Sequence, residues 1–224
     1  MNLEGKIIDF LGDSITEGIG VTNIALNRYD NVIKNKCYLK AVYNYGISGT
    51  RIAHQRNASE SPRADLYFCA RLYDMNPEAD IIVVYGGVND YVHGDAPFGD
   101  ISDKTPATFC GAVDFLMRTL KEFYPKAQIV FMTPAHLQYD TMVESCASDR
   151  KPQGVEGRAL CEYVRIIEEK GKKYNIPVLN LFDKLPINPN IQEEKEKYTV
   201  DGLHFNDAGH NVLADLLIDF IKKI

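Results

Sequence analysis

The chain has 224 residues, a formal net charge of −6 and a pI near 5.4. This length suffices for one domain with a sizeable core, and no Pro-, Gly- or Ser-rich linker divides it, so we predict a single domain over residues 1–224. Because the lysines and arginines are dispersed rather than gathered in a stripe, the composition argues against nucleic acid as a partner.

The first residues, MNLEGKIIDF, lead directly into an apolar run and show no signal-peptide pattern. No run approaches the roughly 20 apolar residues that a membrane-spanning helix needs, so we expect no integral membrane span. The cysteines include no CxxC pair and no Cys/His cluster, which favours buried, reduced thiols at Cys37, Cys69, Cys110, Cys146 and Cys161. We therefore expect a cytoplasmic location, although a sequence trimmed of its leader would look the same.

Apolar runs of strand length recur along the chain, at residues 7–11, 41–47, 81–85, 129–132 and 178–182. Longer segments with helical spacing lie between them. This alternation predicts a parallel sheet, and runs that are nearly all apolar predict strands buried on both faces. The sequence therefore predicts an α/β fold with three layers, α/β/α.

Ser61-Pro62 and Thr105-Pro106 each place a side-chain oxygen before a proline, which predicts two helix starts. After Thr105, a core-facing helical stripe is predicted as far as Tyr124-Pro125, with Phe109, Val113, Leu116, Leu120 and Phe123. Asn206 is predicted to cap a C-terminal helix with inward-facing Val212, Leu213, Leu216, Leu217, Phe220 and Ile221. Residues 192–197 are charged and predicted to lie at the surface.

Three predicted strands are followed by loops with residues suited to acyl transfer. Ser14 follows the first run, Gly49 follows the second in NYGISGT, and Asn89 follows the third in YGGVND. In a sheet of flavodoxin-like order 2-1-3-4-5, these three loops would be adjacent at the carboxyl edge. The backbone N–H groups of Ser14 and Gly49 and the Asn89 amide could then stabilise the negative oxygen that forms when a carbonyl is attacked.

Asp201 and His204 lie three positions apart, just before the C-terminal helix. A serine hydroxyl is too weakly acidic to attack an ester unaided, so it needs a neighbouring base and a group that orients that base. We predict that His204 accepts the proton of Ser14 and that Asp201 orients the imidazole. The three residues would form a catalytic triad in the chain order Ser, Asp, His.

Four blocks of the sequence resemble, in order and spacing, those of the GDSL or SGNH hydrolases: Gly12-Asp13-Ser14 with Gly18, then Gly49, then Gly87-Val88-Asn89-Asp90, then Asp201-Gly202-Leu203-His204. The resemblance spans nearly the whole chain. It implies a flavodoxin-like five-stranded α/β/α fold and metal-free esterase or lipase activity. On the matching positions it implies Ser14 as nucleophile, Gly49 and Asn89 in the oxyanion hole, and Asp201 with His204 completing the triad.

The sequence also departs from the family pattern. Phe205 follows the histidine, where many relatives have proline, and residues 91–104 look like an insertion that could overhang the nucleophile. Residues 135–156 are long for a connection and are candidates for a wall of the substrate pocket. Both segments follow predicted strands at the carboxyl edge of the sheet.

Each motif has a plainer interpretation. Ser14 alone could be a helix N-cap, and Asp201 with His204 could be a surface capping pair. Ser48 is a rival nucleophile, because GISGT differs from the nucleophile elbow GxSxG only at Thr50. The four blocks in order favour Ser14.

Other residues near the predicted site are candidates for substrate contact: Asp13, Arg51, Asp90, His93 and Tyr139. Asp13 and Asp90 are interpreted first as hydrogen-bond acceptors that fix their loops. Arg51 could meet an anionic group of a substrate, and His93 lies in a loop expected near the site. The histidines outside the triad share no spacing, so we predict no metal ion and no cofactor.

The leading hypothesis is a serine esterase that forms an acyl-enzyme at Ser14 and acts on small-molecule or carbohydrate esters with short acyl groups, such as acetylated carbohydrates. A lysophospholipase, a thioesterase or an acyltransferase would use the same triad. An alternative of another class is a non-catalytic flavodoxin-like binding module. The first loop has neither GxGxxG nor a Walker lysine, which argues against a nucleotide-binding module. The sequence gives no indication of oligomeric state.

Overall fold

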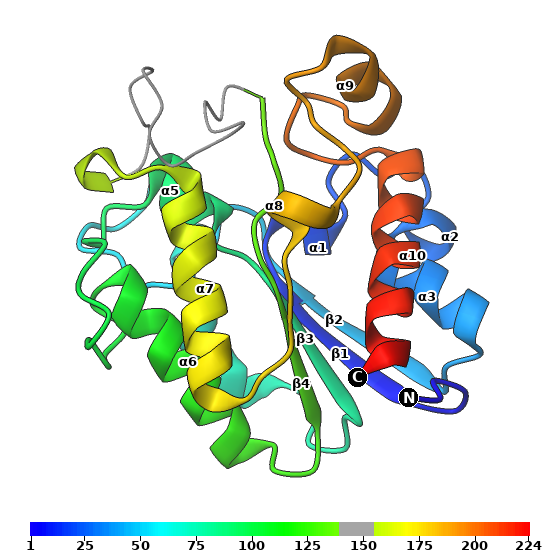
Figure 1. The fold of residues 1–224 in the computed structure, drawn as a ribbon, viewed down its shortest axis with the longest axis horizontal. Coiled ribbons are helices and arrows are strands. Elements are labelled where there is room, and N and C mark those ends of the chain that lie inside the picture. The colour runs from blue at the N-terminus through cyan, green and yellow to red at the C-terminus, as the bar shows by residue number, and fades with distance from the viewer. Residues whose placement is uncertain (139–154) are drawn as a thin grey trace.

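The computed structural model describes residues 1–138 and 155–224, and a five-stranded parallel sheet lies at its centre (Figure 1). The strands are β1 (Ile7–Gly12), β2 (Ala41–Gly46), β3 (Ile81–Tyr85), β4 (Gln128–Met132) and β5 (Val178–Leu179). Their order is β2-β1-β3-β4-β5, and every neighbouring pair is parallel. The predicted strand order and the α/β/α fold class are confirmed.

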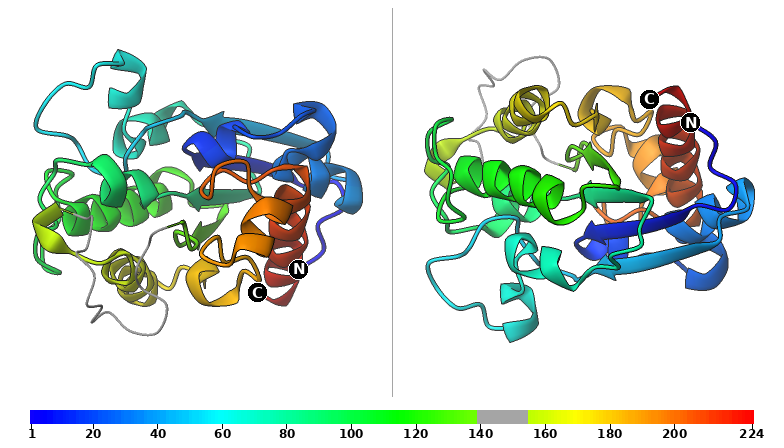
Figure 2. Two further views of the ribbon diagram at one scale, coloured as in Figure 1. Left: turned by 90° about the horizontal axis from the view of Figure 1, so that it is seen from above. Right: turned by 90° about the horizontal axis from the view of Figure 1, so that it is seen from below.

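Helices cover both faces of the sheet (Figure 2). On one face α3 (Tyr29–Cys37) packs against α10 (Asp207–Lys223), and on the other α6 (Phe109–Phe123) packs against α7 (Leu160–Tyr174). Shorter helices in the described part of the chain are α1 (Ser14–Glu17), α2 (Ile24–Asn27), α4 (Phe68–Arg71), α5 (Val88–His93), α8 (Leu181–Lys184) and α9 (Gln192–Tyr198). Turns of 3-10 helix cover Pro62–Asp65, Leu72–Asp74 and Val155–Gly157.

Strands β1 and β3 are buried on both faces, which explains their almost entirely apolar sequences. Phe10 and Val83 belong to the core cluster on the side of α3 and α10, whereas Leu11 and Val84 belong to the cluster on the side of α6 and α7. Strand β2 lies at the edge of the sheet, and its Tyr43 is 45% exposed. The prediction of burial on both faces is therefore wrong for β2.

The fifth strand is shorter than predicted. It ends at Leu179, because Asn180 caps α8 by accepting a hydrogen bond from the Asp183 N–H at 3.0 Å. The apolar residues Leu181 and Phe182, which suggested a longer strand, therefore lie in the first turn of a helix. The chain leaves the sheet earlier than its hydrophobicity indicates.

Helix α6 begins at Phe109 rather than at the predicted Thr105-Pro106 start. Thr108 is its N-cap, and the Thr108 hydroxyl accepts a hydrogen bond from the first turn at 3.1 Å. The other predicted start, Ser61-Pro62, opens only a 3-10 turn, and the Ser61 side chain makes no capping bond. At the end of α6, Phe123 is 57% exposed and lies outside the core that the predicted stripe assigned to it.

The predicted C-terminal helix is present as α10. The Asn206 side chain accepts hydrogen bonds from the N–H groups of Ala208 and Gly209, at 3.0 and 3.1 Å, which confirms the predicted cap. The helix buries Leu213, Leu217 and Ile221, while Val212, Leu216 and Phe220 are partly buried against the same cluster. Among the described residues, no helix has the length and apolar character needed to cross a membrane.

The cysteines do not all follow the prediction. Cys37, Cys69 and Cys110 are free and buried, as expected. Cys161 is disulfide-bonded, so the prediction of reduced thiols is wrong for this residue. Cys146 lies outside the described residues. The cytoplasmic location stays a prediction.

The segment 91–104 packs against the body of the fold. Phe98 is buried, and its ring contacts aromatic rings of α6 and α7. The Lys170 ammonium of α7 donates hydrogen bonds to the carbonyls of Ile101 and Asp103, at 2.7 and 3.4 Å. These contacts hold the segment against the fold, and its overhang above the nucleophile stays a prediction. Of the predicted pocket wall at 135–156, residues 139–154 lie outside the described part.

Asp9 is a carboxyl group buried within β1. One oxygen accepts a hydrogen bond from the Asn76 N–H at 2.8 Å, and the other has no partner among the described residues. Burial raises the pKa of Asp9 from 3.8 to about 7, against the opposing effect of the Asn76 bond. The folded state thus holds the proton more tightly than the unfolded chain. The stability that this group contributes is fully present below about pH 4 and is lost as the pH rises to about 7.

We predict that Asp9→Asn, which cannot ionise, becomes more stable relative to the wild type as the pH rises. The difference in unfolding free energy between the two proteins should move by about 2 kcal/mol in favour of the variant from about pH 5 to about pH 8. Urea unfolding at the two pH values measures this difference.

Asp80→Asn is the matched control. The Lys6 hydrogen bond at 2.8 Å lowers the pKa of Asp80, so this carboxylate is ionised in both states above about pH 5. Its effect on stability should therefore be constant over the same range. A constant effect of Asp9→Asn as well would contradict a buried, protonated Asp9.

Candidate active site

The carboxyl ends of β1, β2 and β3 bring three of the predicted residues to one edge of the sheet (Figure 1). Ser14 is the first residue of α1, directly after β1, and Asn89 lies in the first turn of α5, after β3. Gly49 lies in the loop after β2. Because β1 is the neighbour of both other strands, the three loops meet as the sequence predicts.

Ser14, His204 and Asp201 form a continuous set of hydrogen bonds. The Ser14 Oγ lies 2.9 Å from His204 Nε2, and His204 Nδ1 lies 2.6 Å from Asp201 Oδ2. The other oxygen of Asp201 accepts hydrogen bonds from the backbone N–H groups of Leu203 and His204, at 2.9 and 2.7 Å. The order is that of a nucleophile, a base and a carboxylate that orients the base.

The turn between β1 and α1 positions Ser14. The Asp13 carboxylate caps α1 by accepting a hydrogen bond from the Ile15 N–H at 3.1 Å. A Cβ atom on Gly12 would lie 2.0 Å from Thr16 Oγ1, so the tight turn requires glycine there. The serine side chain is therefore held at the start of a helix by residues on both sides of it.

The loop before α10 positions His204. The Val200 N–H donates to the His204 carbonyl at 2.9 Å, and Gly202 has a left-handed φ of 87° that closes the turn. Phe205, where the family pattern more often has proline, is buried and packs beside the start of α10. Burial of this ring and the Asn206 cap together fix the loop to the helix.

Three hydrogen-bond donors lie in the segments that follow β1, β2 and β3 at the same edge of the sheet. Within the described part of the chain, the backbone N–H groups of Ser14 and Gly49 donate no hydrogen bond to the protein. The Asn89 Nδ2 donates one of its two hydrogens to the Thr50 carbonyl at 3.0 Å and keeps the other. These are the groups predicted to stabilise an oxyanion.

Asp201 is the carboxylate of the set. Although partial burial of its carboxyl opposes ionisation, the hydrogen bonds from the His204 side chain and from the backbone of His204 and Leu203 lower the pKa of Asp201. The carboxylate is therefore ionised at neutral pH and can stabilise a positive charge on the imidazole.

Two of the predicted contact residues, Asp13 and Asp90, are buried beneath the site. Burial raises the pKa of Asp13 to about 7 and that of Asp90 to about 6. Asp90 accepts hydrogen bonds from the N–H groups of Ile52 and Ala53, at 2.9 and 3.0 Å. Both carboxyls thus fix backbone near the site, as the first interpretation held, and neither is exposed for substrate contact.

Arg51 is also buried and bound within the protein. Its guanidinium donates to the Gly49 carbonyl and to Ser59 Oγ, both at 2.8 Å, and Asp65 lies 3.4 Å away. It therefore orients the loop after β2 rather than meeting an anionic substrate group. Of the remaining contact candidates, His93 lies 3.0 Å from the Asn89 side chain, and Tyr139 lies outside the described residues.

The rival nucleophile Ser48 has a different environment. The Ser48 hydroxyl donates to a carboxylate oxygen of Glu17, and the Ser48 backbone N–H donates to the same oxygen at 2.7 Å. A carboxylate beside a serine fixes the hydroxyl, and among the described residues no histidine is hydrogen-bonded to Ser48. Glu17 lies on α1 with Ser14, so this contact joins the loop after β2 to the nucleophile helix.

Arg71 is a residue of the site that the sequence analysis missed. It is buried, and its guanidinium donates hydrogen bonds to the carbonyls of Gly12 and Tyr45 and to Thr50 Oγ1. Burial lowers the pKa of Arg71 to about 10, which leaves it charged at neutral pH. The signal was present: an arginine stands among apolar residues in the segment 68–72, FCARL. A charge in such a stretch indicates a buried, bonded side chain.

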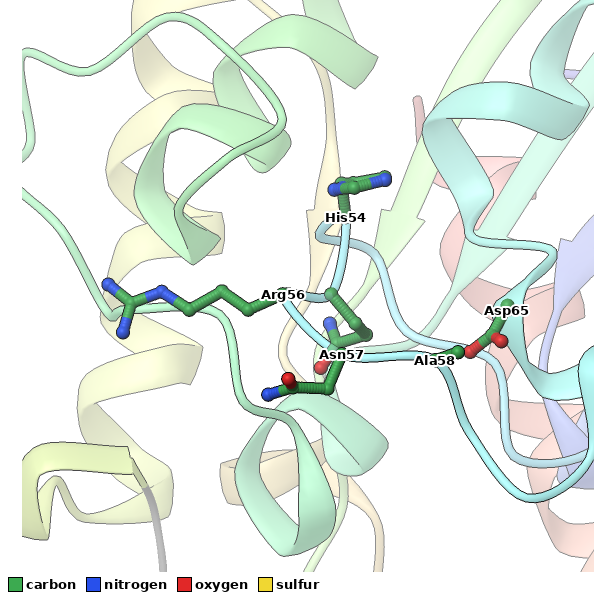
Figure 3. Close-up of a pocket in the computed structure, with 6 residues that line it drawn as sticks. His54, Arg56, Asn57, Ala58 and Asp65 are labelled. Atoms are coloured by element: carbon green, nitrogen blue, oxygen red, sulfur yellow. The ribbon is translucent and has the colours of Figure 1, made fainter.

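A polar cavity of about 290 Å³ lies in the loop that follows Gly49, lined by residues 54–58 and Asp65 (Figure 3). Figure 3 shows the Arg56 side chain extending away from the other lining residues. None of the triad residues lines this cavity. Among the described residues, no group of three or more His, Cys, Asp or Glu side chains is arranged to hold a metal ion.

The chain is similar to one family of known proteins and to several solved structures. The family model described as the GDSL-like lipase/acylhydrolase family matches residues 10–212. One solved structure shares 31% identity, covers 100% of this chain and 99% of its own, and has a TM-score of 0.84. A search of curated proteins finds no significant match.

Two further structures are similar. A protein from Lactobacillus plantarum shares 28% identity over 98% of both chains, with a TM-score of 0.78. An acetyl xylan esterase shares 20% identity, covers 95% of this chain and 98% of its own, and has a TM-score of 0.62. At that identity the acetyl xylan esterase demonstrates a shared fold alone.

The geometry predicts that Ser14, and not Ser48, reacts with a fluorophosphonate, a probe that labels activated serines. Ser14→Ala should abolish the labelling, because among the serines that the structure describes Ser14 alone is hydrogen-bonded to an imidazole. Ser48→Ala should keep most of it, since the Ser48 backbone still bonds to Glu17. Intact-mass spectrometry of the labelled proteins checks both outcomes, and the reverse pattern would mean that the nucleophile is misassigned.

Proposed function

Because the chain belongs to the GDSL-like lipase/acylhydrolase family, we propose that it is a serine esterase that hydrolyses short-chain acyl esters, with acetylated carbohydrates as the substrate class. The observation that supports this most strongly is the unbroken set of hydrogen bonds from Ser14 through His204 to Asp201. These groups provide a nucleophile, a base and an orienting carboxylate, the parts that ester hydrolysis needs.

In the first half of the reaction, Ser14 Oγ attacks the ester carbon while His204 Nε2 accepts the hydroxyl proton. The electron pair of the C=O bond moves to the carbonyl oxygen. The free N–H groups of Ser14, Gly49 and Asn89 are the donors available to that oxygen. When the C=O bond re-forms, the bond to the alcohol oxygen breaks, and His204 gives the proton to the departing alcohol.

In the second half, water replaces the alcohol. His204 takes a proton from the water as its oxygen attacks the acyl carbon on Ser14, and it returns the proton to Ser14 Oγ as the acid leaves. Asp201 keeps the imidazole in the orientation that faces Ser14 throughout, because Nδ1 stays bound to the carboxylate. The enzyme regains its starting state after each turnover.

A small cavity supports a short acyl group. Its volume is about 10 Å³, which is room for one water-sized or methyl-sized group. Ile15, Val88 and Leu203, the chain neighbours of Ser14, Asn89 and His204, are three of its lining residues. In the proposed reaction the acyl group enters this space, which would admit a methyl group and exclude a longer chain.

The choice of acetylated carbohydrates rests on this small cavity and on the fold shared with an acetyl xylan esterase. The experiment is a panel of nitrophenyl esters from acetyl to octanoyl, run beside acetylated xylo- and manno-oligosaccharides with release of acetate measured. Wild type should hydrolyse the acetyl ester fastest and release acetate from the oligosaccharides, and Ser14→Ala should do neither. Turnover of long-chain esters without acetate release would favour a lipase or lysophospholipase instead.

We predict that Val88→Ala broadens the acyl preference. Removing two methyl groups from the wall should raise kcat/KM for the butyryl ester relative to the acetyl ester by about tenfold, the effect of a methylene or two in an apolar pocket. The nitrophenyl panel measures the ratio.

Val84→Ala is the matched control, because Val84 is buried in β3 and does not line the cavity. It should lower stability by a similar amount and leave the butyryl to acetyl ratio unchanged. Equal ratios in the two variants would remove the acyl-pocket assignment while leaving the triad in place.

A further inference from the structure

The side-chain amide of Asn89 has two possible orientations, and its contacts select one. Asn89 is 5% exposed, and its Nδ2 lies 3.0 Å from the Thr50 carbonyl oxygen. A carbonyl oxygen can only accept, so the atom that faces it must be the amide nitrogen rather than the amide oxygen. The Thr50 carbonyl therefore fixes which end of the amide points toward the loop after β2.

The opposite end of the same amide faces a histidine. Asn89 Oδ1 lies 3.0 Å from Nε2 of His93, four residues further along α5. An amide oxygen can only accept, so His93 Nε2 must bear the hydrogen of this bond. Burial and the nearby Arg51 charge lower the pKa of His93, so the imidazole is neutral at neutral pH and has a single N–H.

Rotating the amide by half a turn would set its oxygen against the Thr50 carbonyl, which can only accept. The amide nitrogen would then face His93 Nε2, and that contact would survive only if the imidazole changed to the Nδ1–H tautomer. With the Nε2–H tautomer, two acceptors and two donors would oppose each other in a buried place. In the observed orientation both ends are satisfied, and one N–H of Asn89 has no partner among the described residues.

We infer that His93 is a positioning residue for the oxyanion hole: its Nε2–H bond to Asn89 Oδ1 keeps the free amide hydrogen of Asn89 aimed at the oxygen of the transition state. This gives the residue a part in the reaction, although it does not touch the reacting atoms. The inference rests on the proposed esterase activity for its kinetic consequence and on the Asn89 geometry alone for its hydrogen-bond consequence.

The kinetic test uses three substitutions of nearly matched size. His93→Gln places an amide donor where Nε2 stood, and it should retain kcat within about threefold of wild type, because the bond to Oδ1 is kept. His93→Leu lacks any donor and should lower kcat about tenfold with little change in KM, since the amide is no longer held. His93→Glu has the shape of the glutamine variant but only accepts when ionised.

At about pH 8, His93→Glu should lower kcat about 100-fold, close to the loss from Asn89→Ala, because its carboxylate opposes Asn89 Oδ1 and favours the reversed amide. KM for the acetyl ester should move little in all variants, and thermal midpoints should separate a loss of fold from a loss of rate. Equal kcat in the Gln, Leu and Glu variants, or a change in KM in place of kcat, would overturn the inference.

A second readout needs no turnover. Nitrogen-15 NMR of the wild-type imidazole should show His93 as the Nε2–H tautomer at neutral pH, and the Asn89 side-chain amide signals should shift in His93→Leu but less in His93→Gln. An Nδ1–H tautomer would overturn the inference even in an active esterase. A wild type that shows the Nε2–H tautomer but hydrolyses no ester would leave the hydrogen bond established and refute the proposed function instead.

Discussion

The hydrogen bond between Ser14 Oγ and His204 Nε2 joins two loops that are 190 residues apart in the chain. It forms only if the segment that leads into α10 packs beside the loop after α1. Two contacts show this packing. The Thr22 N–H donates to the Asp207 carboxylate at 2.9 Å, and a Cβ on Gly20 would lie 2.6 Å from the Phe205 carbonyl oxygen. The loop after α1 and the loop before α10 therefore fit directly against each other, which places the imidazole at the nucleophile.

Beneath this contact, buried charged groups fix the backbone of the site. Arg71 bonds to carbonyls at the ends of β1 and β2, and Asp90 of α5 accepts two N–H groups of the loop after β2. A buried charged group without hydrogen bonds costs free energy. Breaking the bonds of Arg71 or Asp90 is therefore unfavourable, and the bonds hold each loop to its neighbour. Asp13 adds a carboxyl whose pKa burial raises to about 7, and Arg71 is the nearby positive charge that opposes this rise. These bonds join the loops where the chemistry needs fixed donors.

The sequence predicted the strands and the triad residues because both have local signals: apolar runs for buried strands, and short motifs at fixed spacing. The strand order came from the resemblance to a known family, because apolar runs do not encode it. It failed at β5, where Leu181 and Phe182 are apolar but follow a capping asparagine, and at α6, where Thr108 rather than Thr105 provides the cap. The parts played by Arg71 and Arg51 could not be predicted, because their partners are backbone carbonyls brought near by the fold. The spacing of residues in the sequence reveals neither a hydrogen bond to a backbone carbonyl nor the disulfide at Cys161.

In this mechanism Ser14 and His204 act as one unit. A double-mutant cycle tests it most directly: kcat for the acetyl ester is measured in Ser14→Ala, in His204→Ala and in the protein with both changes. If the two residues act together, removing the second causes no further loss of kcat, so the double variant should be no slower than the slower single variant. The kcat of every variant should be at least about 1,000-fold below that of the wild type. Losses that multiply in the double variant would mean that the two residues act independently, and the claim would be contradicted.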